Sequence, residues 1–327
     1  MAIIVPEKLK KGDEIRVVAP AQSIKLPFIT KEFVDNGIRN LEQMGLKVSF
    51  GKHIEESDSF DSTSIANRIE DLHDAFADKN VKAVMTVIGG FNSNQLLEYI
   101  DYELIKRNPK ILVGYSDITA LQNAIFRKTG MITYSGPHFF SFGYPHDLNY
   151  TRDYFIKCLF ESKPFGLKPS NSSTEWSSKE RKTLSHENKG IWAMRKGKAR
   201  GRIIGANLCT FNLLQGTEFM PSIKNSILFI EDDDGSNDVL FDRDLQSLLH
   251  QPHAKEIRGI VIGRMQSDTA ITKEVLEQII STKNIGNIPI LANVDFGHTY
   301  PMITFPIGGT ASLNVGGETP ELRIVKH

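Results

Sequence analysis

In the first half of the chain, short and nearly continuous hydrophobic runs alternate with stretches that have a helical period. The runs predict strands at EIRVVAP (14–20), LKVSF (46–50), VKAVMTVIGG (81–90), KILVGYS (110–116) and MITYSGP (131–137). The intervening stretches predict helices over about 31–42, where Phe33, Val34, Ile38 and Leu41 share a face, and at about 62–77, 94–107 and 117–128. Continuous apolar strands are expected where helices cover both faces of a parallel sheet. We therefore predict a doubly wound α/β domain over residues 1–163.

Residues 164–190 interrupt this pattern, because they are rich in Ser, Lys, Pro and Asn and have no periodic apolar positions. We interpret them as a connecting segment between two domains. Short strands dominate residues 191–327, among them NSILFIED, EIRGIVIG, IPILANVD and MITFPIGG, with helical patterns near 207–215, 238–250 and 271–283. This part of the chain predicts a smaller, strand-rich α/β domain.

The composition is that of an ordinary globular protein of 327 residues, of which 40% are hydrophobic and 24% are charged. Lys and Arg number 39 and Asp and Glu number 39, so a nucleic-acid or anionic-membrane partner held by bulk charge is not supported. No stretch reaches the ~20 apolar residues of a membrane span, and the amino terminus lacks the signal-peptide pattern, so we expect a soluble, cytoplasmic protein. Cys158 and Cys209 lie in apolar patterns and are expected to be buried thiols.

The common cofactor and metal motifs GxxxxGK[ST], GxGxxG, HExxH and CxxC are absent from the sequence. The segment IGGFNSN (88–94) joins a predicted strand to a predicted helix, and it could hold an anion or simply form a tight turn. The acidic segment EDDDGSND (231–238) does not have the spacing of an EF-hand, so we predict a solvated turn in which Asn237 or Asp238 caps the next helix. We expect neither a metal nor a cofactor.

The segment VGYSD (113–117) places Ser116 where a predicted strand turns sharply into a predicted helix. In such a turn the side chain projects from the carboxyl edge of the sheet, and the following backbone N–H groups point outward as oxyanion donors. Ser is also a preferred helix N-cap, and Ile118 stands where the hydrolase elbow G-x-S-x-G has its second Gly. These residues alone fit either a nucleophile or a cap.

A serine nucleophile requires a base, and the base requires an orienting carboxylate at a neighbouring loop edge. His298 lies in GHTYP after the strand IPILANVD, and Glu231 ends the strand NSILFIE. Both also fit structural roles, as a turn histidine and as an exposed strand-end carboxylate. His138 in SGPHFF is the rival base. From reference values alone the pKa of His298 is expected at about 6–7.

Several segments together carry a family resemblance that covers nearly the whole chain: VVAPAQS, IGGFNSNQLL, ILVGYSDITAL, YSGPHF, GKARGRIIGANL, ILFIEDDDG and GHTYPMITFPIG. With these segments the chain resembles the LD-carboxypeptidase family of serine peptidases, and within it the microcin C immunity (MccF-like) branch. The resemblance implies an amino-terminal domain like that of class I glutamine amidotransferases, a smaller carboxy-terminal domain and commonly a homodimer. Amidotransferases have Cys at the elbow where this chain has Ser116, which disfavours ammonia transfer from glutamine.

Carried over residue by residue, the resemblance implies that Ser116 is the nucleophile, His298 the general base and Glu231 the acid that orients it. It also implies an oxyanion hole formed by the backbone N–H groups of Asp117 and Gly90.

For the substrate, a small molecule, the resemblance offers two classes. One branch removes a terminal D-amino acid from a muropeptide stem, as in cell-wall recycling, and the other cleaves the bond between an acidic residue and the nucleotide part of processed microcin C. Trp176 favours the second class, because an aromatic residue at this position of the MccF-like branch stacks on adenine. Asn207 is a further candidate substrate contact. A third hypothesis is a non-catalytic protein that holds a small anion between the two domains.

Overall fold

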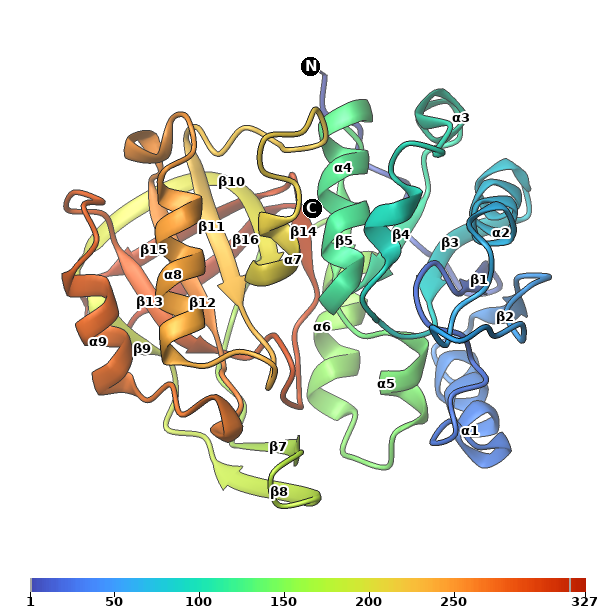
Figure 1. Cartoon of the computed structure of the whole chain (residues 1–327), viewed down its shortest axis with the longest axis horizontal. Coiled ribbons are helices and arrows are strands. Elements are labelled where there is room, and N and C mark those ends of the chain that lie inside the picture. The colour runs from blue at the N-terminus through green and yellow to red at the C-terminus, as the bar shows by residue number, and fades with distance from the viewer. Residues whose placement is uncertain (1, 318) are drawn as a thin grey trace.

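The computed structural model describes residues 2–317 and 319–327 and shows a mixed α/β fold built on two large sheets (Figure 1). The first sheet has the strand order β14-β5-β4-β3-β1-β2, and the second has the order β6-β16-β15-β10-β11-β12-β13-β9. Strands β7 and β8 form a separate hairpin. In Figure 1 the first sheet and its helices lie on the right, the second sheet on the left, and the hairpin below.

The first sheet is parallel except for one edge strand and is covered by helices on both faces. Its parallel strands are β1 (Glu14–Val18), β2 (Lys47–Phe50), β3 (Val81–Thr86), β4 (Ile111–Gly114) and β5 (Thr133–Ser135). One face carries α1 (Lys31–Glu42), α5 (Phe139–Gly143) and α6 (Asn149–Leu159). The other carries α2 (Ile65–Ala77), α3 (Tyr102–Arg107) and α4 (Thr119–Thr129), with the short helices η1 (Ser93–Leu96) and η2 (Ser116–Ile118). The predicted doubly wound sheet is therefore present, while its likeness to glutamine amidotransferases stays a prediction.

The second sheet is mixed, as expected for the strand-rich half of the chain. Its parallel core is β10 (Gly197–Asn207), β11 (Ser226–Glu231), β12 (Gly259–Gly263) and β13 (Ile290–Val294). Antiparallel strands flank it: β9 (Trp192–Arg195), β15 (Thr310–Val315), β16 (Glu321–Lys326) and β6 (Phe165–Gly166). The helices are α7 (Leu208–Asn212), α8 (Asp238–Leu249), α9 (Lys273–Ser281), η3 (Ala254–Glu256) and η4 (Ser267–Thr269). Within residues 2–317 and 319–327, no helix has both the length and the apolarity to cross a bilayer.

Segment 164–190 is more ordered than its composition predicted. It contains β6 and the hairpin of β7 (Ser172–Ser177) and β8 (Lys182–Glu187). In β7 the buried positions alternate, but they are Ser173, Glu175 and Ser177. Because a period of two shows as hydrophobicity only when the inward side chains are apolar, the pattern could not reveal this strand.

Three other predictions were wrong. Strand β14 (Phe305–Ile307), expected in the second sheet, pairs antiparallel with β5 of the first sheet. The helix expected at about 94–107 is divided into η1 and α3. Cys158 is buried as expected, but Cys209 is exposed, because it lies on the outer side of α7 while Leu208 and Phe211 face inward.

A cluster of buried aromatic rings joins the two sheets. Phe305 of β14 packs on Phe229 of β11 with ring centroids 4.8 Å apart, and Phe296 lies 5.0 Å from Phe305. Since Phe305 belongs to the first sheet and Phe229 to the second, these contacts fix how the carboxyl ends of the two sheets meet.

We expect Phe305→Ala to lower the free energy of unfolding by about 3–5 kcal/mol, because it leaves a cavity where the two sheets join. Urea denaturation measures the change. Phe60→Ala is the control, since Phe60 is 75% exposed, and it should stay within about 0.5 kcal/mol of the parent protein. Equal unfolding midpoints for the two variants would show that the cluster does not hold the sheets together.

Candidate active site

Ser116, Glu231 and His298 come from different strand ends and meet in one hydrogen-bonded chain. Ser116 follows β4 in the first sheet, Glu231 is the last residue of β11 in the second, and His298 lies in the loop after β13. The Nε2 atom of His298 is 2.9 Å from Ser116 Oγ, and its Nδ1 is 2.8 Å from Glu231 Oε2. Ser116 has a φ of 59°, the left-handed conformation of a strained turn. The structure thus unites the three side chains that the sequence singled out.

Two glycines allow this close approach. A Cβ atom on Gly89 would lie 2.9 Å from Ser116 Cβ and 3.4 Å from the backbone nitrogen of Asp117. A Cβ atom on Gly297, which has a φ of 110°, would lie 2.6 Å from Glu231 Oε2. The glycine turn after β3 therefore sits directly against the Ser116 turn. In the described part of the chain, neither the Gly90 N–H nor the Asp117 N–H donates to a protein acceptor.

The acidic surroundings of His298 control its charge. Burial by itself would lower the pKa of His298, but the charge and hydrogen bond of Glu231, together with the charges of Asp233 and Asp232, raise it to about 9. This differs from the ordinary range expected from the sequence, because Glu231 is only 2% exposed and its carboxylate lies in direct contact with the imidazole, at 2.8 Å. In the free protein the imidazole is therefore protonated at neutral pH.

His138, the rival base, has a different position. Its Nε2 atom lies 3.0 Å from the backbone nitrogen and 2.9 Å from the backbone oxygen of Tyr115, and its ring stacks on the Tyr115 ring at 4.1 Å. Burial lowers its pKa to about 3, so it is neutral. His138 supports the backbone just before Ser116, whereas His298 contacts the Ser116 hydroxyl.

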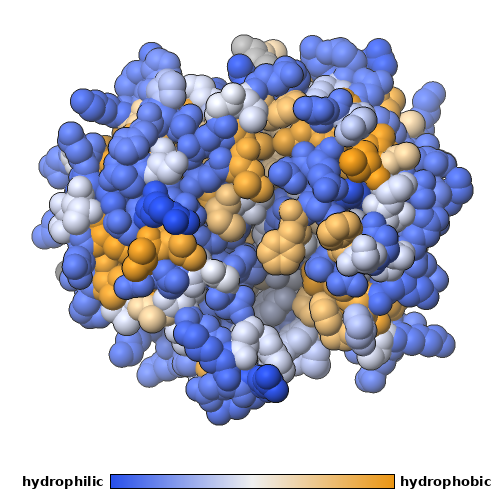
Figure 2. Space-filling view, viewed as in Figure 1, coloured by the Kyte–Doolittle hydropathy of each residue, from blue (hydrophilic) through white to orange (hydrophobic). Residues whose placement is uncertain are grey.

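Two adjoining cavities open at His298. One of about 540 Å³ has an aromatic lining that includes Phe28, Phe33, Tyr115, Phe140, Tyr144, Trp176 and Tyr300. The other, of about 300 Å³, is formed by Ser116, the glycine turn, Asp233 and Asp234. Trp176 is 52% exposed at the edge of the aromatic cavity. Figure 2 shows a hollow on this face between the two halves of the molecule, above the hydrophilic surface of the hairpin. The hydroxyl of Ser116 and an aromatic surface thus face the same opening.

Hydrogen bonds of the backbone and of neighbouring side chains hold the strand of Trp176 beside this opening. Thr174 of β7 and Tyr300 exchange two backbone hydrogen bonds of 2.7 Å each. The carboxylate of Glu175 accepts from the Ser267 N–H at 3.0 Å, and Gln266 Nε2 donates to the Trp176 carbonyl at 3.2 Å. The sequence analysis missed Tyr300 and Tyr115 as cavity residues, and their proximity in sequence to His298 and Ser116 is the one signal that pointed to them.

Asn207, the other candidate substrate contact, is 1% exposed and lines neither cavity. It is the N-cap of α7, where its Oδ1 accepts from the Thr210 N–H at 3.1 Å, and its Nδ2 donates to Asp232 Oδ1 at 3.4 Å. A substrate contact of Asn207 stays a prediction.

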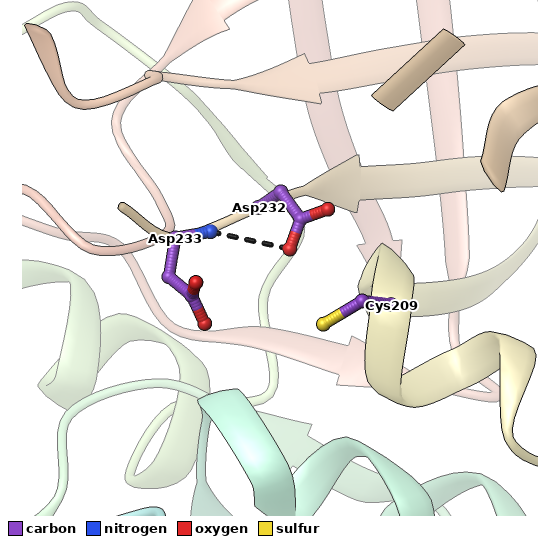
Figure 3. A group of neighbouring side chains, drawn as sticks. All are labelled: Cys209, Asp232 and Asp233. Atoms are coloured by element: carbon purple, nitrogen blue, oxygen red, sulfur yellow. Dashed lines mark hydrogen bonds between the residues drawn. The ribbon is translucent and has the colours of Figure 1, made fainter. Parts of the chain in front are cut away.

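The acidic turn after β11 behaves as expected at Asn237, whose side chain caps α8. Within this turn Asp232 and Asp233 lie near Cys209, with one ligand atom of each inside 4.8 Å of the others (Figure 3). Asp232 Oδ1 already accepts from the Asp233 N–H, and burial raises the pKa of Asp232 to about 7. Partial burial of the sulfur and the nearby carboxylates raise the pKa of the Cys209 thiol, which opposes the thiolate that a metal would need. We assign no metal to this cluster.

Comparison with protein families agrees with this geometry. A model of the LD-carboxypeptidase N-terminal domain matches residues 15–136, and a model of the LD-carboxypeptidase C-terminal domain matches residues 200–313. The chain belongs to the LD-carboxypeptidase family. Its class is therefore that of the serine peptidases, which are hydrolases.

Curated relatives carry two kinds of name. The carboxypeptidase-named protein YocD of Bacillus subtilis (strain 168) is 48% identical over 98% of this chain and 99% of its own length. Microcin C7 self-immunity protein MccF of Escherichia coli is 36% identical over 83% of this chain and 82% of its own. The murein tetrapeptide carboxypeptidase of Pseudomonas aeruginosa is 26% identical over 91% of this chain and 92% of its own.

Solved structures show the same fold. An MccF-like protein from Bacillus anthracis superposes with a TM-score of 0.94 at 46% identity, over 99% of this chain and 100% of that one. MccF in complex with aspartyl sulfamoyl adenosine superposes with a TM-score of 0.87 at 29% identity, over 99% of each chain. This LD-carboxypeptidase family member thus shares its whole architecture with MccF structures.

The two histidines near Ser116 should titrate very differently. By NMR of the imidazole C–H protons, His298 should titrate with a midpoint of about 9, while His138 should stay neutral between about pH 5 and 10. Glu231→Gln should move the His298 midpoint downward, because it removes the charge that contributes most to raising this pKa. A midpoint near the ordinary value of 6.5 in the parent protein would contradict this electrostatic description.

Proposed function

We propose that this family member is an MccF-like serine amidohydrolase that cleaves the amide-type bond between an acidic aminoacyl group and a nucleotide. Ser116 is the nucleophile, His298 the general base and Glu231 the acid that orients it. The observation that carries the proposal is the contact of His298 with both partners, 2.9 Å to Ser116 Oγ and 2.8 Å to Glu231 Oε2, beside an aromatic cavity. The proposal requires no metal or cofactor, and the homodimer implied by the resemblance stays a prediction.

The geometry supports a two-step hydrolysis. Neutral His298 takes the proton of Ser116 as its oxygen attacks the substrate carbonyl, and the hydrogen bond from Nδ1–H to Glu231 fixes the tautomer and stabilises the imidazolium that forms. His298 then protonates the leaving nitrogen, an acyl-serine remains, and water activated by His298 releases the acyl group. Since the base must be neutral to begin, activity should rise with pH as His298 loses its proton.

The negative oxygen of the tetrahedral intermediate needs donors fixed in advance. The N–H groups of Asp117 and Gly90 are suitable, because both belong to the two turns that meet at Ser116 and neither has a protein acceptor in the described part of the chain. In comparable sites each such donor contributes on the order of 3 kcal/mol to transition-state stabilisation.

The aromatic cavity supports a nucleotide as one half of the substrate. Half-exposed Trp176 offers a ring face on which a purine can stack, and the cavity of about 540 Å³ beside it is lined largely by further rings. Among solved structures with this fold, MccF is described in complex with aspartyl sulfamoyl adenosine. Both observations favour an aminoacyl-nucleotide as the substrate class.

A muropeptide is the second candidate substrate, as for a muramoyltetrapeptide LD-carboxypeptidase. The lining of a neighbouring cavity of about 640 Å³ includes the serine and threonine residues Ser170, Ser172, Ser173, Thr174, Thr183 and Ser185. It shares Tyr144, Thr174, Thr183 and Tyr300 with the aromatic cavity, so a long, hydroxyl-rich substrate could extend into it.

The third hypothesis, a non-catalytic binding protein, was wrong, because the chain belongs to a family of serine peptidases.

The parent protein should hydrolyse aspartyl or glutamyl sulfamoyl adenosine, and Ser116→Ala should abolish this reaction while unfolding within about 1 kcal/mol of the parent. Product formation is followed by liquid chromatography. Ser281→Ala, an exposed serine on α9, is the matched control and should keep full activity. Continued turnover by Ser116→Ala would reject the nucleophile. Release of D-alanine from a tetrapeptide stem without cleavage of the adenosine conjugate would instead select the muropeptide.

Trp176→Ala should raise KM for the adenosine conjugate about tenfold or more and change kcat little, because stacking on an aromatic side chain is worth about 1–3 kcal/mol per base. Trp176→Phe keeps an aromatic face and should restore most of the affinity. Steady-state kinetics separate the two constants. An unchanged KM together with a lower melting temperature would show that Trp176 only packs against its own hairpin.

A further inference from the structure

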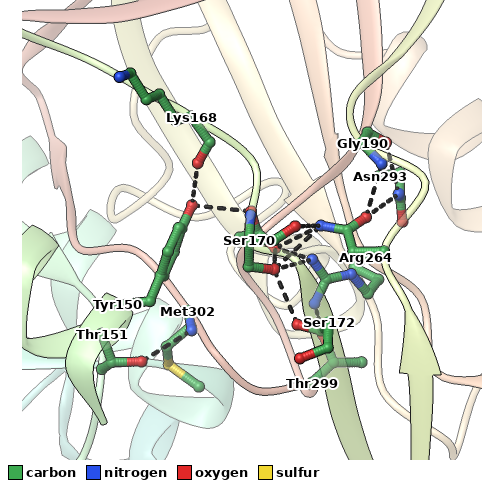
Figure 4. A network of polar contacts seen from close by, with 12 residues as sticks. Tyr150, Thr151, Lys168, Ser170, Ser172, Gly190, Arg264, Asn293, Thr299 and Met302 are labelled. Atoms are coloured by element: carbon green, nitrogen blue, oxygen red, sulfur yellow. Dashed lines mark hydrogen bonds and ion pairs between the residues drawn. The ribbon is translucent and has the colours of Figure 1, made fainter. Parts of the chain in front are cut away.

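A buried carboxylate, that of Asp295, lies three residues before His298 and has partners in several segments of the chain. Figure 4 shows three of these partners, Tyr150, Ser170 and Arg264, within one network of polar contacts. Asp295, 2% exposed, follows β13 and opens the loop that carries His298. Its Oδ2 accepts from the Tyr150 hydroxyl of α6 at 2.8 Å and from the Ser170 N–H at 2.8 Å. Its Oδ1 accepts from Ser170 Oγ at 2.7 Å and from Asn188 Nδ2 at 3.3 Å. So many donors on one carboxylate leave it little freedom to move.

The partners of Asp295 include both ends of the hairpin that carries Trp176. Ser170 lies just before β7 and Asn188 just after β8. Asn188 Nδ2 also donates to the Ser170 carbonyl at 2.9 Å, so the two ends are tied to each other as well as to Asp295. The base of the hairpin is thereby fixed to the residue that begins the His298 loop.

Arg264, 6% exposed, pairs with this carboxylate from the loop after β12. Its guanidinium also donates to Ser170 Oγ at 3.2 Å and to Thr299 Oγ1 at 3.3 Å, next to His298 in the chain. Its backbone N–H donates to the carbonyls of Val294 and Phe296, on either side of Asp295. A buried ion pair persists only when both charges keep their partners, so Arg264 and Asp295 hold each other in place.

The loop itself is closed by backbone contacts. The N–H of Ile303 donates to the Asp295 carbonyl at 2.7 Å, and the Met302 N–H donates to Thr151 Oγ1 of α6 at 3.1 Å. Between these anchors lie His298 and Tyr300, and Tyr300 is paired with Thr174 of the hairpin. Any displacement of the hairpin base at Asp295 therefore reaches His298 through a loop fixed at both ends.

We propose that Asp295 is a positioning residue that couples the Trp176 hairpin to His298, so that the substrate-binding strand and the base keep one relative placement. Asp295, Ser170 and Arg264 line neither of the two cavities at Ser116, so they act through His298 and the hairpin and not by contact with the reacting atoms there. The proposal rests on the proposed role of His298 as the base.

The first test uses covalent labelling of Ser116 by a serine-directed phosphonate, which requires no knowledge of the substrate. Ser170→Ala removes one donor to Asp295 and the acceptor for Arg264, and it should slow labelling by about ten- to a hundredfold, since misplacement by ~1 Å is enough for such a loss. Ser281→Ala, at an exposed serine on α9 that lies outside this network and outside the cavities, is the matched control and should label at the parent rate. Asp295→Asn should slow labelling at least as much as Ser170→Ala.

The second test is a double-mutant cycle on kcat/KM for aspartyl sulfamoyl adenosine with Ser170→Ala and Trp176→Ala. Ser170 and Trp176 share no hydrogen bond, so their effects should multiply if the two sites are independent. If the two sites are coupled through Asp295, the effect of the double variant on kcat/KM should differ by at least about threefold from the product of the two single-variant effects. Ser170→Ala should also lower kcat more than it raises KM.

The outcomes separate this inference from the proposed function. A parent protein that the phosphonate does not label would overturn both. A labelled parent with equal labelling of Ser170→Ala, or with independent effects in the cycle, would overturn the role of Asp295 and leave the proposed function intact. If Asp295→Asn does not fold, Ser170→Ala and its control still decide the question.

Discussion

The hydrogen bond between His298 and the buried carboxylate of Glu231 is the contact on which the site depends. A carboxylate that is 2% exposed is stable only with a close donor, and the imidazole supplies one at 2.8 Å. That bond orients the ring, so its other nitrogen points at Ser116. The same bond, with the acidic turn after β11, sets the charge of the imidazole. The position and the protonation of His298, the proposed base, therefore both depend on the contact with Glu231.

The architecture makes this contact possible by placing the carboxyl ends of two sheets against each other. Ser116 is presented by the first sheet, and Glu231 and His298 by the second. Phe305 lies in a strand of the first sheet but packs on the second, so the aromatic cluster is part of what sets the distance across the site. The hairpin that carries Trp176 pairs through Thr174 with Tyr300, which lies in the same loop as His298. In the proposed mechanism this contact links the substrate-binding hairpin to the base.

Much of this could be predicted from the sequence. The continuous apolar runs located the parallel strands β1 to β5 of the first sheet and β11 to β13 of the second, but not the short strands β6 and β9. The turn at Ser116 followed from a strand that leads directly into a helix. The roles of Glu231 and His298 came from the family resemblance, because nothing in the spacing of two residues 67 positions apart shows that they touch. The β7–β8 hairpin escaped detection because its inward residues, such as Glu175, are polar. Asp295 and Arg264 carried no local signal, since their partners are distributed over segments that meet only in the folded protein.

The raised pKa of His298 means that the proposed base is competent only in the fraction of molecules whose imidazole is neutral, and this fraction grows as the pH rises toward about 9. The most direct test of this account is mass spectrometry of the protein, both intact and after digestion to peptides, following acid quenching during hydrolysis of aspartyl sulfamoyl adenosine. The proposed mechanism, with Ser116 as the nucleophile, predicts a transient aspartyl adduct on the peptide that contains Ser116, and a longer-lived adduct when release of the acyl group is slowed at low pH. Turnover with no adduct, or with an adduct on another residue, would contradict it.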